Sequence, residues 1–291
     1  MSTPVSVSVL ATALSFLFVP GHRPERFAKA LASGAHAVII DLEDAVPMSA
    51  KAEARSAIVA AWAGFSAEQR SCFLVRINPI GTAWHADDVA LLGQLTGLGG
   101  VMLPKAESGP SVAAVAAACP GLPVLPLIES AEGFAHLDAI AHAPQVVRLG
   151  LGHIDLQADL GMACGPDETE LAPARWALVV ASRRAKLVAP VDGVTTATHD
   201  TEALLRDTRR SRRCGFGAKL CIHPAQVAGV HEGFAATEAE LDWAQRVLAA
   251  EQVAGGGAFS VDGKMIDPPV LLLAHQLLSR ARSVSPSVGG I

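Results

Sequence analysis

Eight short apolar runs recur along the chain, each followed by polar residues, and no other feature restricts the possible folds as strongly. The runs are continuously apolar instead of alternating with polar residues, which is typical of parallel strands covered on both faces. Hydrophobic residues make up 51% of the 291-residue chain, so a deep core is available to cover them. In chain order the predicted strands are Phe16–Val19, Ala37–Ile40, Phe73–Ile77, Gly100–Leu103, Val124–Ile128, Val146–Leu151, Val191–Thr195 and Lys219–Ile222.

Helical segments separate these runs. The segment after the first run begins at Pro24 and ends before Gly34, a common placement for proline and glycine at helix ends. Ser49, Ser108 and Ser130 are placed to cap the N-termini of three further helices. Eight alternations of strand and helix predict an α/β fold, a (β/α)8 TIM barrel closed through its last strand. A doubly wound open sheet is the alternative, although no Gly-x-Gly-x-x-Gly motif follows a strand.

A different pattern begins after the eighth run. A Thr-x-x-Glu capping box at Thr237 predicts a helix to Ala254, and Asp262-Gly263 predicts the turn of a hairpin. A last helix is predicted from Asp267-Pro268 to about Arg282. We therefore predict a barrel domain over residues 1–236 and a C-terminal helical and hairpin segment over residues 237–291, which acts as a lid or in oligomerisation. Within that segment, residues 255–257 are predicted to form a flexible joint and residues 283–291 a frayed end.

Composition excludes several classes of protein. The net charge is −5 with no basic block, aromatic residues make up 4% and Tyr is absent, so no nucleic-acid partner is expected. The five cysteines form no Cys-x-x-Cys pair, which argues against a disulfide framework or a thiolate zinc site, and scattered free thiols predict a cytoplasmic protein. The apolar start lacks the positive region of a signal peptide, and no run is long enough to predict a membrane span.

Polar side chains stand directly after most of the predicted strands. In a barrel these positions meet at one mouth, where the active sites of this fold are built. Carboxylates gathered in a mouth of low dielectric repel one another unless a cation lies between them. The candidates in chain order are Asp41, Glu43, Asp44, Arg76, Lys105, Glu129, His153, Asp155 and His223.

Glu129 and Asp155 are the predicted metal ligands among these candidates. Hard oxygen ligands without a thiolate favour Mg²⁺, with Mn²⁺ as a substitute, and Mg²⁺ usually takes only one or two carboxylates. Arg76 is predicted to hold a substrate carboxylate through a bidentate pair. A metal ion, an arginine and carboxylates together predict an enolate-forming reaction on a carboxylic acid.

Seven motifs occur in a specific order and spacing. They are Leu17-Phe-Val-Pro-Gly-His-Arg-Pro-Glu-Arg26, Ile40-Asp-Leu-Glu-Asp-Ala-Val46, Val75-Arg-Ile-Asn78, Leu103-Pro-Lys105, Ile128-Glu-Ser-Ala-Glu-Gly133, Gly152-His-Ile-Asp-Leu-Gln-Ala-Asp-Leu-Gly161 and Cys221-Ile-His-Pro-Ala-Gln226. Together they resemble the citrate lyase β-subunit (CitE-like) family of the HpcH/HpaI aldolase superfamily. The resemblance implies a TIM barrel that breaks or forms a carbon–carbon bond in a 3-hydroxyacyl-CoA, such as malyl-CoA, citramalyl-CoA or a citryl thioester, giving an acyl-CoA and a 2-keto acid.

The resemblance also implies roles for individual residues. Glu129 and Asp155 match the glutamate and aspartate that bind Mg²⁺ in that family. Arg76 matches the arginine that grips the keto-acid carboxylate. Arg23, and with it Lys29, match the first-strand loop that lies near CoA, so both are candidates for binding the CoA thioester.

A further match lies near the C-terminus, in Gly263-Lys-Met-Ile-Asp-Pro-Pro269. In some members of the family the aspartate of this motif reaches the site of a neighbouring subunit as an acid or base, which implies that role for Asp267. The resemblance implies a homotrimer or a hexamer of trimers. The sixth-strand motif departs from the family pattern at His153, where many relatives carry a small or acidic residue.

Several of these residues also suit a purely structural role. Glu43 and Asp44 are assigned to the catalytic set, around the waters of the metal, but they are equally able to cap the second loop. Arg76 also suits a salt bridge with Asp41 or Glu43, although substrate binding is the favoured role. Glu129 also suits the acidic position at a helix N-terminus, and Asp155 suits a loop cap. Asp267 suits a helix N-cap, and Arg23 and Lys29 suit the solvated start of a helix.

Lys105 suggests a rival mechanism, in which it forms a Schiff base with the substrate as in metal-free aldolases. The pair of carboxylates argues against this mechanism, because Schiff-base chemistry needs no metal cation.

The function predicted from these observations is a Mg²⁺-dependent lyase of retro-Claisen or retro-aldol type. Two different functions stay open beside it. One is a metal-dependent aldolase that acts on free hydroxy-keto acids without CoA. The second is a thioesterase, or a non-catalytic subunit of a larger lyase complex.

Overall fold

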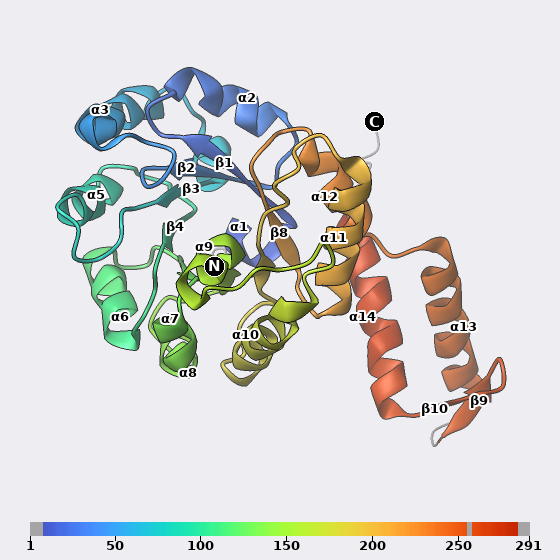
Figure 1. Ribbon diagram of the computed structural model, residues 1–291. Helices are drawn as coiled ribbons and strands as arrows, with labels where there is room; N and C mark the ends of the chain where they lie inside the picture. The colour runs from blue at the N-terminus through green and yellow to red at the C-terminus, as the bar shows by residue number, and fades with distance from the viewer. Residues whose placement is uncertain (1–7, 255–257, 285–291) are drawn as a thin grey trace, which may run out of the picture. The chain divides into compact units, whose positions relative to one another are not determined.

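Eight parallel strands close into a barrel, and their order around it is their order in the sequence (Figure 1). The computed structural model describes residues 8–254 and 258–284. The strands are β1 (Ser15–Pro20), β2 (Ala37–Asp41), β3 (Phe73–Arg76), β4 (Gly100–Leu103), β5 (Val124–Ile128), β6 (Gly150–Leu151), β7 (Val191–Asp192) and β8 (Ala218–Cys221). Pairing of β1 with β8 closes the ring. The predicted TIM barrel is confirmed.

Two of the strands are shorter than predicted. Only Gly150–Leu151 of the sixth run and Val191–Asp192 of the seventh form regular strands. The start of the sixth run still lies beside β5, because Val146 forms an isolated parallel bridge with Val124. The buried side chain of Arg148 follows, and its guanidinium donates to backbone carbonyls of Leu10, Ala13 and Ala189.

Helices and short 3₁₀ turns surround the barrel. They are α1 (Val9–Thr12), η1 (Pro24–Arg26), α2 (Phe27–Ala32), η2 (Met48–Ala50), α3 (Lys51–Trp62), α4 (Ala67–Ser71), α5 (His85–Leu92), α6 (Gly109–Ala118), α7 (Ala131–Ala135), α8 (Leu137–Ala141), α9 (His153–Leu160), η3 (Thr169–Leu171), α10 (Ala172–Arg184), α11 (Thr201–Arg213) and α12 (Gln226–Phe234). Ser108 and Ser130 cap α6 and α7 as predicted. The cap predicted at Ser49 is wrong, because Ser49 lies inside η2 and α3 begins after Ala50 without a side-chain cap.

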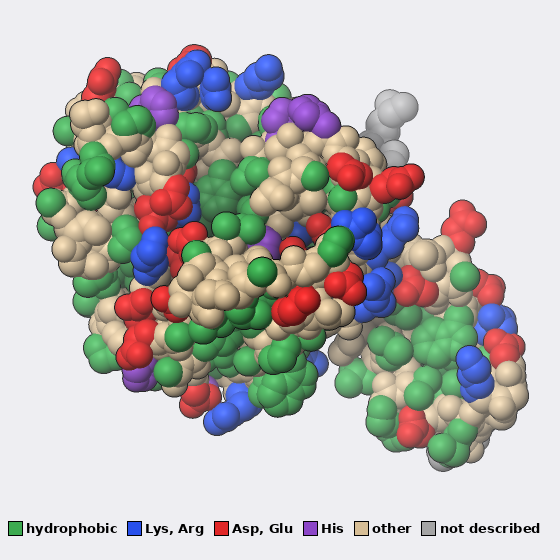
Figure 2. Space-filling view, viewed as in Figure 1, with side chains coloured by type: hydrophobic (Ala, Val, Ile, Leu, Met, Phe, Trp, Pro, Cys, Tyr) green, Lys and Arg blue, Asp and Glu red, His purple; other side chains and the backbone are tan. Residues whose placement is uncertain are grey.

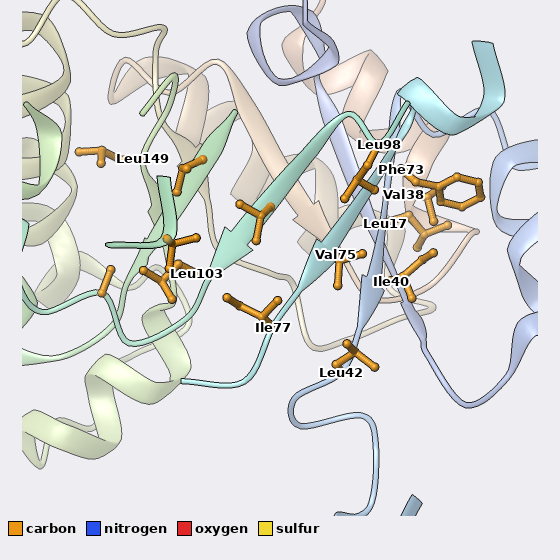
Figure 3. Packing of buried hydrophobic residues seen from close by; sticks show 14 of the residues in the cluster. Leu17, Val38, Ile40, Leu42, Phe73, Val75, Ile77, Leu98, Leu103 and Leu149 are labelled. Carbon is orange, nitrogen blue, oxygen red and sulfur yellow. The ribbon is translucent and has the colours of Figure 1, made fainter. Parts of the chain in front are cut away.

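The strands bury apolar side chains on both of their faces. On β2, Ile39 packs inside the barrel, whereas Val38 and Ile40 pack between the barrel and its helices. Figure 3 shows this outer layer, in which Leu17, Val38, Ile40 and Val75 come from neighbouring strands. Because both faces are covered, each strand appears in the sequence as a continuous apolar run.

Helix α1 belongs to the interior of the barrel. Its Leu10 is fully buried in the same cluster as the inward-facing strand residues. A Cβ at Gly100, the first residue of β4, would lie 2.4 Å from Leu10 Cδ1. This end of the barrel is therefore filled by α1, which leaves the opposite end of the strands for a site.

The chain divides into two compact units, Met1–Phe234 and Ala235–Ile291. The second unit contains α13 (Glu238–Ala254), the antiparallel strands β9 (Phe259–Val261) and β10 (Lys264–Ile266), and α14 (Pro268–Val284). Thr237 and Glu240 form the predicted capping box, and Asp262 and Gly263 both have positive φ, as a tight hairpin turn requires. Its role as a lid stays a prediction.

Two sequence predictions fall outside the described residues. The joint at residues 255–257 lies there, as does nearly all of the frayed end predicted over residues 283–291. Within the described part of the chain, no helix combines the length and hydropathy needed to cross a bilayer.

Candidate active site

A cavity of about 430 Å³ opens at the C-terminal ends of the strands. Figure 2 shows it as a hollow with apolar side chains inside and acidic side chains along one edge. Its apolar lining includes Phe18, Leu127, Leu151, Val194, Leu220 and Ile222, and its polar lining is Asp41, Asp44, Arg76, Glu129, His153 and Asp155. The predicted position of the site, at the mouth, therefore coincides with a real cavity.

Strand alternation places three of these polar side chains inside the mouth. Asp41, Arg76 and Glu129 each come two residues after an inward-facing apolar residue, namely Ile39, Leu74 and Leu127. Because successive side chains of a strand point to opposite faces, the polar residue continues the inward-facing row. The same local pattern that builds the core thus ends each row with a polar group at the mouth.

Arg76 is held by three carboxylates. Asp41 is its register partner on the neighbouring strand, and Arg76 Nε and Nη2 each donate to one Asp41 oxygen at 2.7 Å. Arg76 Nη1 lies 2.8 Å from Glu43 Oε2 and 3.3 Å from Asp44 Oδ2. Burial opposes the charge on Arg76, but the nearby Asp41, Glu43 and Asp44 outweigh it and raise the pKa of the guanidinium. The salt bridge considered for Arg76 in the sequence analysis is therefore present in the structure.

Glu129 is buried at the end of β5, with 4% of its surface exposed. Its Oε1 accepts a hydrogen bond from the backbone N–H of Lys105 at 2.8 Å. The other oxygen lies against Gly152, where a Cβ would come within 2.2 Å of Glu129 Oε2. Only glycine at position 152 leaves this carboxylate in place.

Asp155 and Glu43 complete an acidic group around one lysine. Asp155 lies in the first turn of α9 and is half-exposed, and its Oδ2 is 3.3 Å from Lys105 Nζ. Glu43 is buried, and its Oε1 is 3.3 Å from the same Nζ. Carboxylates from three separate elements thus gather around Lys105, although the sequence analysis considered this lysine only as a Schiff-base residue.

The electrostatics of this group show an excess of negative charge. Burial raises the pKa of Glu129 to about 8, and the nearby Glu43 and Asp155 add to the rise. Burial also raises the pKa of Glu43. Burial lowers the pKa of Lys105, but the nearby Glu43, Glu129 and Asp155 outweigh burial, so the pKa of the ammonium lies above its usual value. A cation is therefore favoured among these oxygens.

The donor set suits Mg²⁺ better than a metal that needs a complete protein cage. Across residues 8–254 and 258–284, no three His, Cys, Asp or Glu side chains form a ready-made metal site. Mg²⁺ keeps several waters and usually takes only one or two carboxylates, so Glu129 and Asp155 would be enough protein ligands for it. The buried carboxyl oxygens of Glu129 and the absence of thiolates from the mouth lining agree with this choice.

A buried lysine supports the loop that carries Glu43. Lys51 Nζ donates to the carbonyls of Leu42 and Glu43 and to Asn78 Oδ1, at 2.7 to 2.9 Å. Asn78 in turn donates through its backbone and side chain to Asp88 Oδ2. Sequence reasoning missed Lys51, since a lysine at a helix start is usually solvated and nothing local marks it as buried.

His153 belongs to a second polar network behind the mouth. Its Nε2 lies 3.4 Å from Glu168 Oε1, and Glu168 also pairs with Arg175. Arg175 reaches the fully buried Asp192 on β7. Burial opposes the charge on Glu168, but hydrogen bonds from His153 and Arg175 hold the pKa of Glu168 below its usual range. This network explains His153 as a hydrogen-bonding residue.

The remaining predicted residues lie away from the cavity lining or in the second unit. Arg23 is exposed and its Nε is 2.5 Å from Glu25, and Lys29 is exposed on α2. Asp267 precedes α14, and its Oδ1 accepts a hydrogen bond from the backbone N–H of Val270 at 3.3 Å. The N-cap position considered for Asp267 is thus present, and the binding and catalytic roles of these residues stay predictions.

Comparison with known proteins identifies a family that the chain matches. A family model described as HpcH/HpaI aldolase/citrate lyase matches residues 14–224. The chain is 38% identical over 275 residues to a citrate lyase subunit beta-like protein of Deinococcus radiodurans, which covers 91% of this chain and 96% of that protein.

Two further relatives come from Cereibacter sphaeroides. A (3S)-malyl-CoA thioesterase is 31% identical, with 93% of this chain and 95% of the relative covered. An L-malyl-CoA/beta-methylmalyl-CoA lyase is 34% identical, with 92% and 94% covered.

The fold is similar to that of a solved structure from Mycobacterium tuberculosis. The protein CitE, in complex with magnesium, acetoacetate and coenzyme A, matches with a TM-score of 0.83 and 35% identity. The match covers 94% of this chain and 99% of that one.

Proposed function

The chain belongs to the HpcH/HpaI aldolase/citrate lyase family, whose members include carbon–carbon lyases, and we propose that it is a Mg²⁺-dependent lyase of a 3-hydroxyacyl-CoA. Malyl-CoA, citramalyl-CoA and citryl thioesters are the proposed substrate class, and the products are an acyl-CoA and a 2-keto acid. The observation that carries the proposal is the gathering of Glu43, Glu129 and Asp155 around Lys105 at the mouth of a barrel, two of them at its ammonium and Glu129 at its backbone N–H.

Glu129 and Asp155 would hold the metal. When bound there, Mg²⁺ supplies Lewis-acid stabilisation for the negative charge that develops on the substrate oxygens, which is worth several kcal/mol of barrier. The magnesium and coenzyme A in the M. tuberculosis CitE complex support Mg²⁺ as the metal and a CoA thioester as the substrate.

Arg76 binds the carboxylate of the keto acid in this scheme. Its two hydrogen bonds to Asp41 use Nε–H and one Nη2–H of the five N–H donors that a guanidinium carries, while Nη1 lies at ion-pair distance from Glu43 and Asp44. Asp44 is the most replaceable partner, because it is 64% exposed and 3.3 Å away. A substrate carboxylate therefore takes the place of Asp44, while Asp41 keeps the guanidinium oriented.

Glu43 is placed to hold or accept a proton beside the reacting atoms. It is buried between Arg76 and Lys105, and burial raises the pKa of its carboxyl group. A raised pKa brings a carboxyl group closer to the range where proton transfer is efficient at neutral pH. The apolar lining from Phe18, Leu127 and Leu220 keeps water away from the enolate.

Asp267 is proposed as the acid that protonates the enolate in the site of a neighbouring copy. The matched test is Asp267→Asn, since asparagine caps helices about as well as aspartate. We expect an unchanged melting temperature and a kcat that falls about 10²-fold, the scale of positioned acid–base catalysis. An unchanged kcat would leave Asp267 as a helix cap only. Arg23 and Lys29 are proposed to contact the CoA portion.

The direct test is an assay of the purified protein with MgCl₂ against malyl-CoA, citramalyl-CoA and the corresponding free acids. A lyase releases a 2-keto acid, detected with phenylhydrazine, together with an intact acyl-CoA. Turnover of the free acids alone would favour an aldolase that does not use CoA. No turnover of any substrate would favour a non-catalytic subunit.

Thioester hydrolysis is a second candidate, because the relatives include (3S)-malyl-CoA thioesterases. The same assay distinguishes it, since hydrolysis releases free CoA thiol without a keto acid. A thiol reagent and a keto-acid reagent applied to one reaction therefore decide between the two activities.

A further inference from the structure

Lys105 has an unusual backbone at the point where β4 ends. Its φ is 45°, in the left-handed region that residues other than glycine rarely adopt. Such conformations persist where the surroundings determine them strongly, and they cluster at functional sites. Here the conformation directs both the N–H and the side chain of one residue toward the acidic group.

The same residue contacts three carboxylates in two different ways. Its backbone N–H donates to Glu129 Oε1 at 2.8 Å. Its ammonium lies 3.3 Å from Glu43 Oε1 and 3.3 Å from Asp155 Oδ2. The first contact depends on the backbone alone, whereas the contacts with Glu43 and Asp155 depend on the side chain and can be lost independently.

The side-chain contacts of Lys105 are of the kind that exchange readily. The ammonium is half-exposed, at 44%, and sits on a flexible four-carbon stem. Asp155 is half-exposed as well. Arg76, by contrast, is buried and holds Asp41 in two contacts of 2.7 Å. One cation of the mouth is thus fixed and the second can leave.

We propose that Lys105 is a positioning residue whose ammonium serves as the built-in counter-ion of the metal-free site and gives up Asp155 when the divalent ion binds. This inference rests on the proposed metal site. The backbone N–H keeps Glu129 oriented in both states, and the ammonium stays beside Glu43. The lysine therefore prevents the carboxylates from repelling one another before the metal arrives, at the cost of competing with it.

The test is metal affinity, measured with Mn²⁺ by calorimetry and by the loss of its free-ion EPR signal. Lys105→Met keeps the stem and removes the charge, so we expect the Kd for Mn²⁺ to fall about tenfold, equivalent to about 1.4 kcal/mol. Lys105→Arg keeps the charge and is expected to bind Mn²⁺ as the wild type does. In EDTA, the melting temperature of Lys105→Met is expected to fall, and Mn²⁺ is expected to restore it.

The matched control is Lys186→Met. Lys186 is also exposed and also has positive φ, at 58°, but it follows α10 at the opposite end of the strands. Its removal is expected to leave Mn²⁺ affinity unchanged.

Each outcome has a separate meaning. A wild-type protein that binds no Mn²⁺ would overturn the proposed metal site. A wild-type protein that binds Mn²⁺, with Lys105→Met binding equally or more weakly, would overturn the counter-ion role alone. Tighter binding in both Lys105→Met and Lys186→Met would show a general charge effect and would also overturn it.

Discussion

The two sides of the barrel mouth are built differently. On the β2–β3 side, Arg76 and Asp41 are both buried and joined by two hydrogen bonds. Lys51 donates to backbone carbonyls of the loop that follows β2 and so holds this loop in place. On the β4–β6 side, Lys105 reaches Glu43 and Asp155 only at 3.3 Å. On the first side the charges are held by short, buried contacts, whereas on the second side no side-chain cation is bonded to the buried Glu129 in the described part of the chain. We infer that the first side orients the substrate and the second side receives a cation.

The sharpest test of this difference is Glu129→Gln. The amide keeps the shape but cannot ionise to bind a metal, so metal binding should be lost, and we expect kcat/KM to fall about 10³-fold or more. The melting temperature of the variant should not fall, because burial disfavours the charged form of Glu129 in the folded protein. Full turnover of this variant in excess EDTA would contradict the assignment of Glu129 as a metal ligand.

Asp41→Asn tests the rigid side. Removing the charge of Asp41 breaks the two-bond pair and leaves the buried Arg76 with only Glu43 and Asp44 as anionic partners, so we expect a loss of about 3 kcal/mol in the free energy of unfolding, measured by urea denaturation. Asp44→Asn is the matched control, because Asp44 is exposed and its contact with Arg76 is longer. Its loss should stay within about 1 kcal/mol. Equal losses would mean that the two contacts are not as different as their geometry indicates.

Gly152→Ala tests whether the position of Glu129 matters apart from its charge. The new Cβ would lie 2.2 Å from Glu129 Oε2, so the carboxylate must move, and we expect activity to fall about 10²-fold, as for misplaced catalytic groups in general. Gly64→Ala is the control, since its Cβ would meet nothing closer than 3.4 Å. Activity and Mg²⁺ affinity equal to those of the wild type in Gly152→Ala would show that the site tolerates a displaced Glu129.

The pH dependence of metal binding gives a graded effect, which is small close to pH 8. Burial raises the pKa of Glu129 to about 8 in the metal-free protein, so Mg²⁺ must displace a proton at lower pH. We expect Mg²⁺ affinity to fall about tenfold for each unit of pH below 8 and to level off above it. Calorimetry from pH 6 to pH 9 measures this, and a flat profile would contradict it.

The same shift has a consequence for stability. Because the pKa of Glu129 is higher in the folded protein than the value of 4.5 that is usual for a glutamate side chain, the folded state holds the proton more tightly. The contribution of the Glu129 carboxyl group to the free energy of unfolding is therefore fully present below about pH 4.5 and is lost as pH rises toward 8. Added Mg²⁺ should reduce this loss, which thermal melts with and without EDTA will show.

Much of the fold was predictable because its signals are local. Each of the eight apolar runs overlaps a strand, since a parallel strand buried on both faces needs apolar residues over most of its length. Ser108, Ser130 and Thr237 were also recognisable as caps from a few neighbouring residues. Ser49 shows the limit of this reasoning, because a 3₁₀ turn shifted the helix start past it.

The site was predictable in its members but not in its pairing. The sequence places Asp41, Arg76, Glu129 and Lys105 at strand ends, because each follows its own apolar run. It offers the salt bridge of Arg76 with Asp41, 35 residues away, only as one of two roles, and it does not indicate that Lys105 would meet a carboxylate 62 residues away. Nor does it mark Gly152 as the position that leaves space for Glu129.

The sequence by itself therefore determined the strands, their order and the chemical types of residue at the mouth. Only the tertiary structure decided which charges face each other, which are buried, and that Lys105 stands where a metal is proposed to bind. The physical reason is that burial of an apolar strand is set by its own residues. The energy of a charge, in contrast, depends on the distance and exposure of every charge that the closed barrel brings near it.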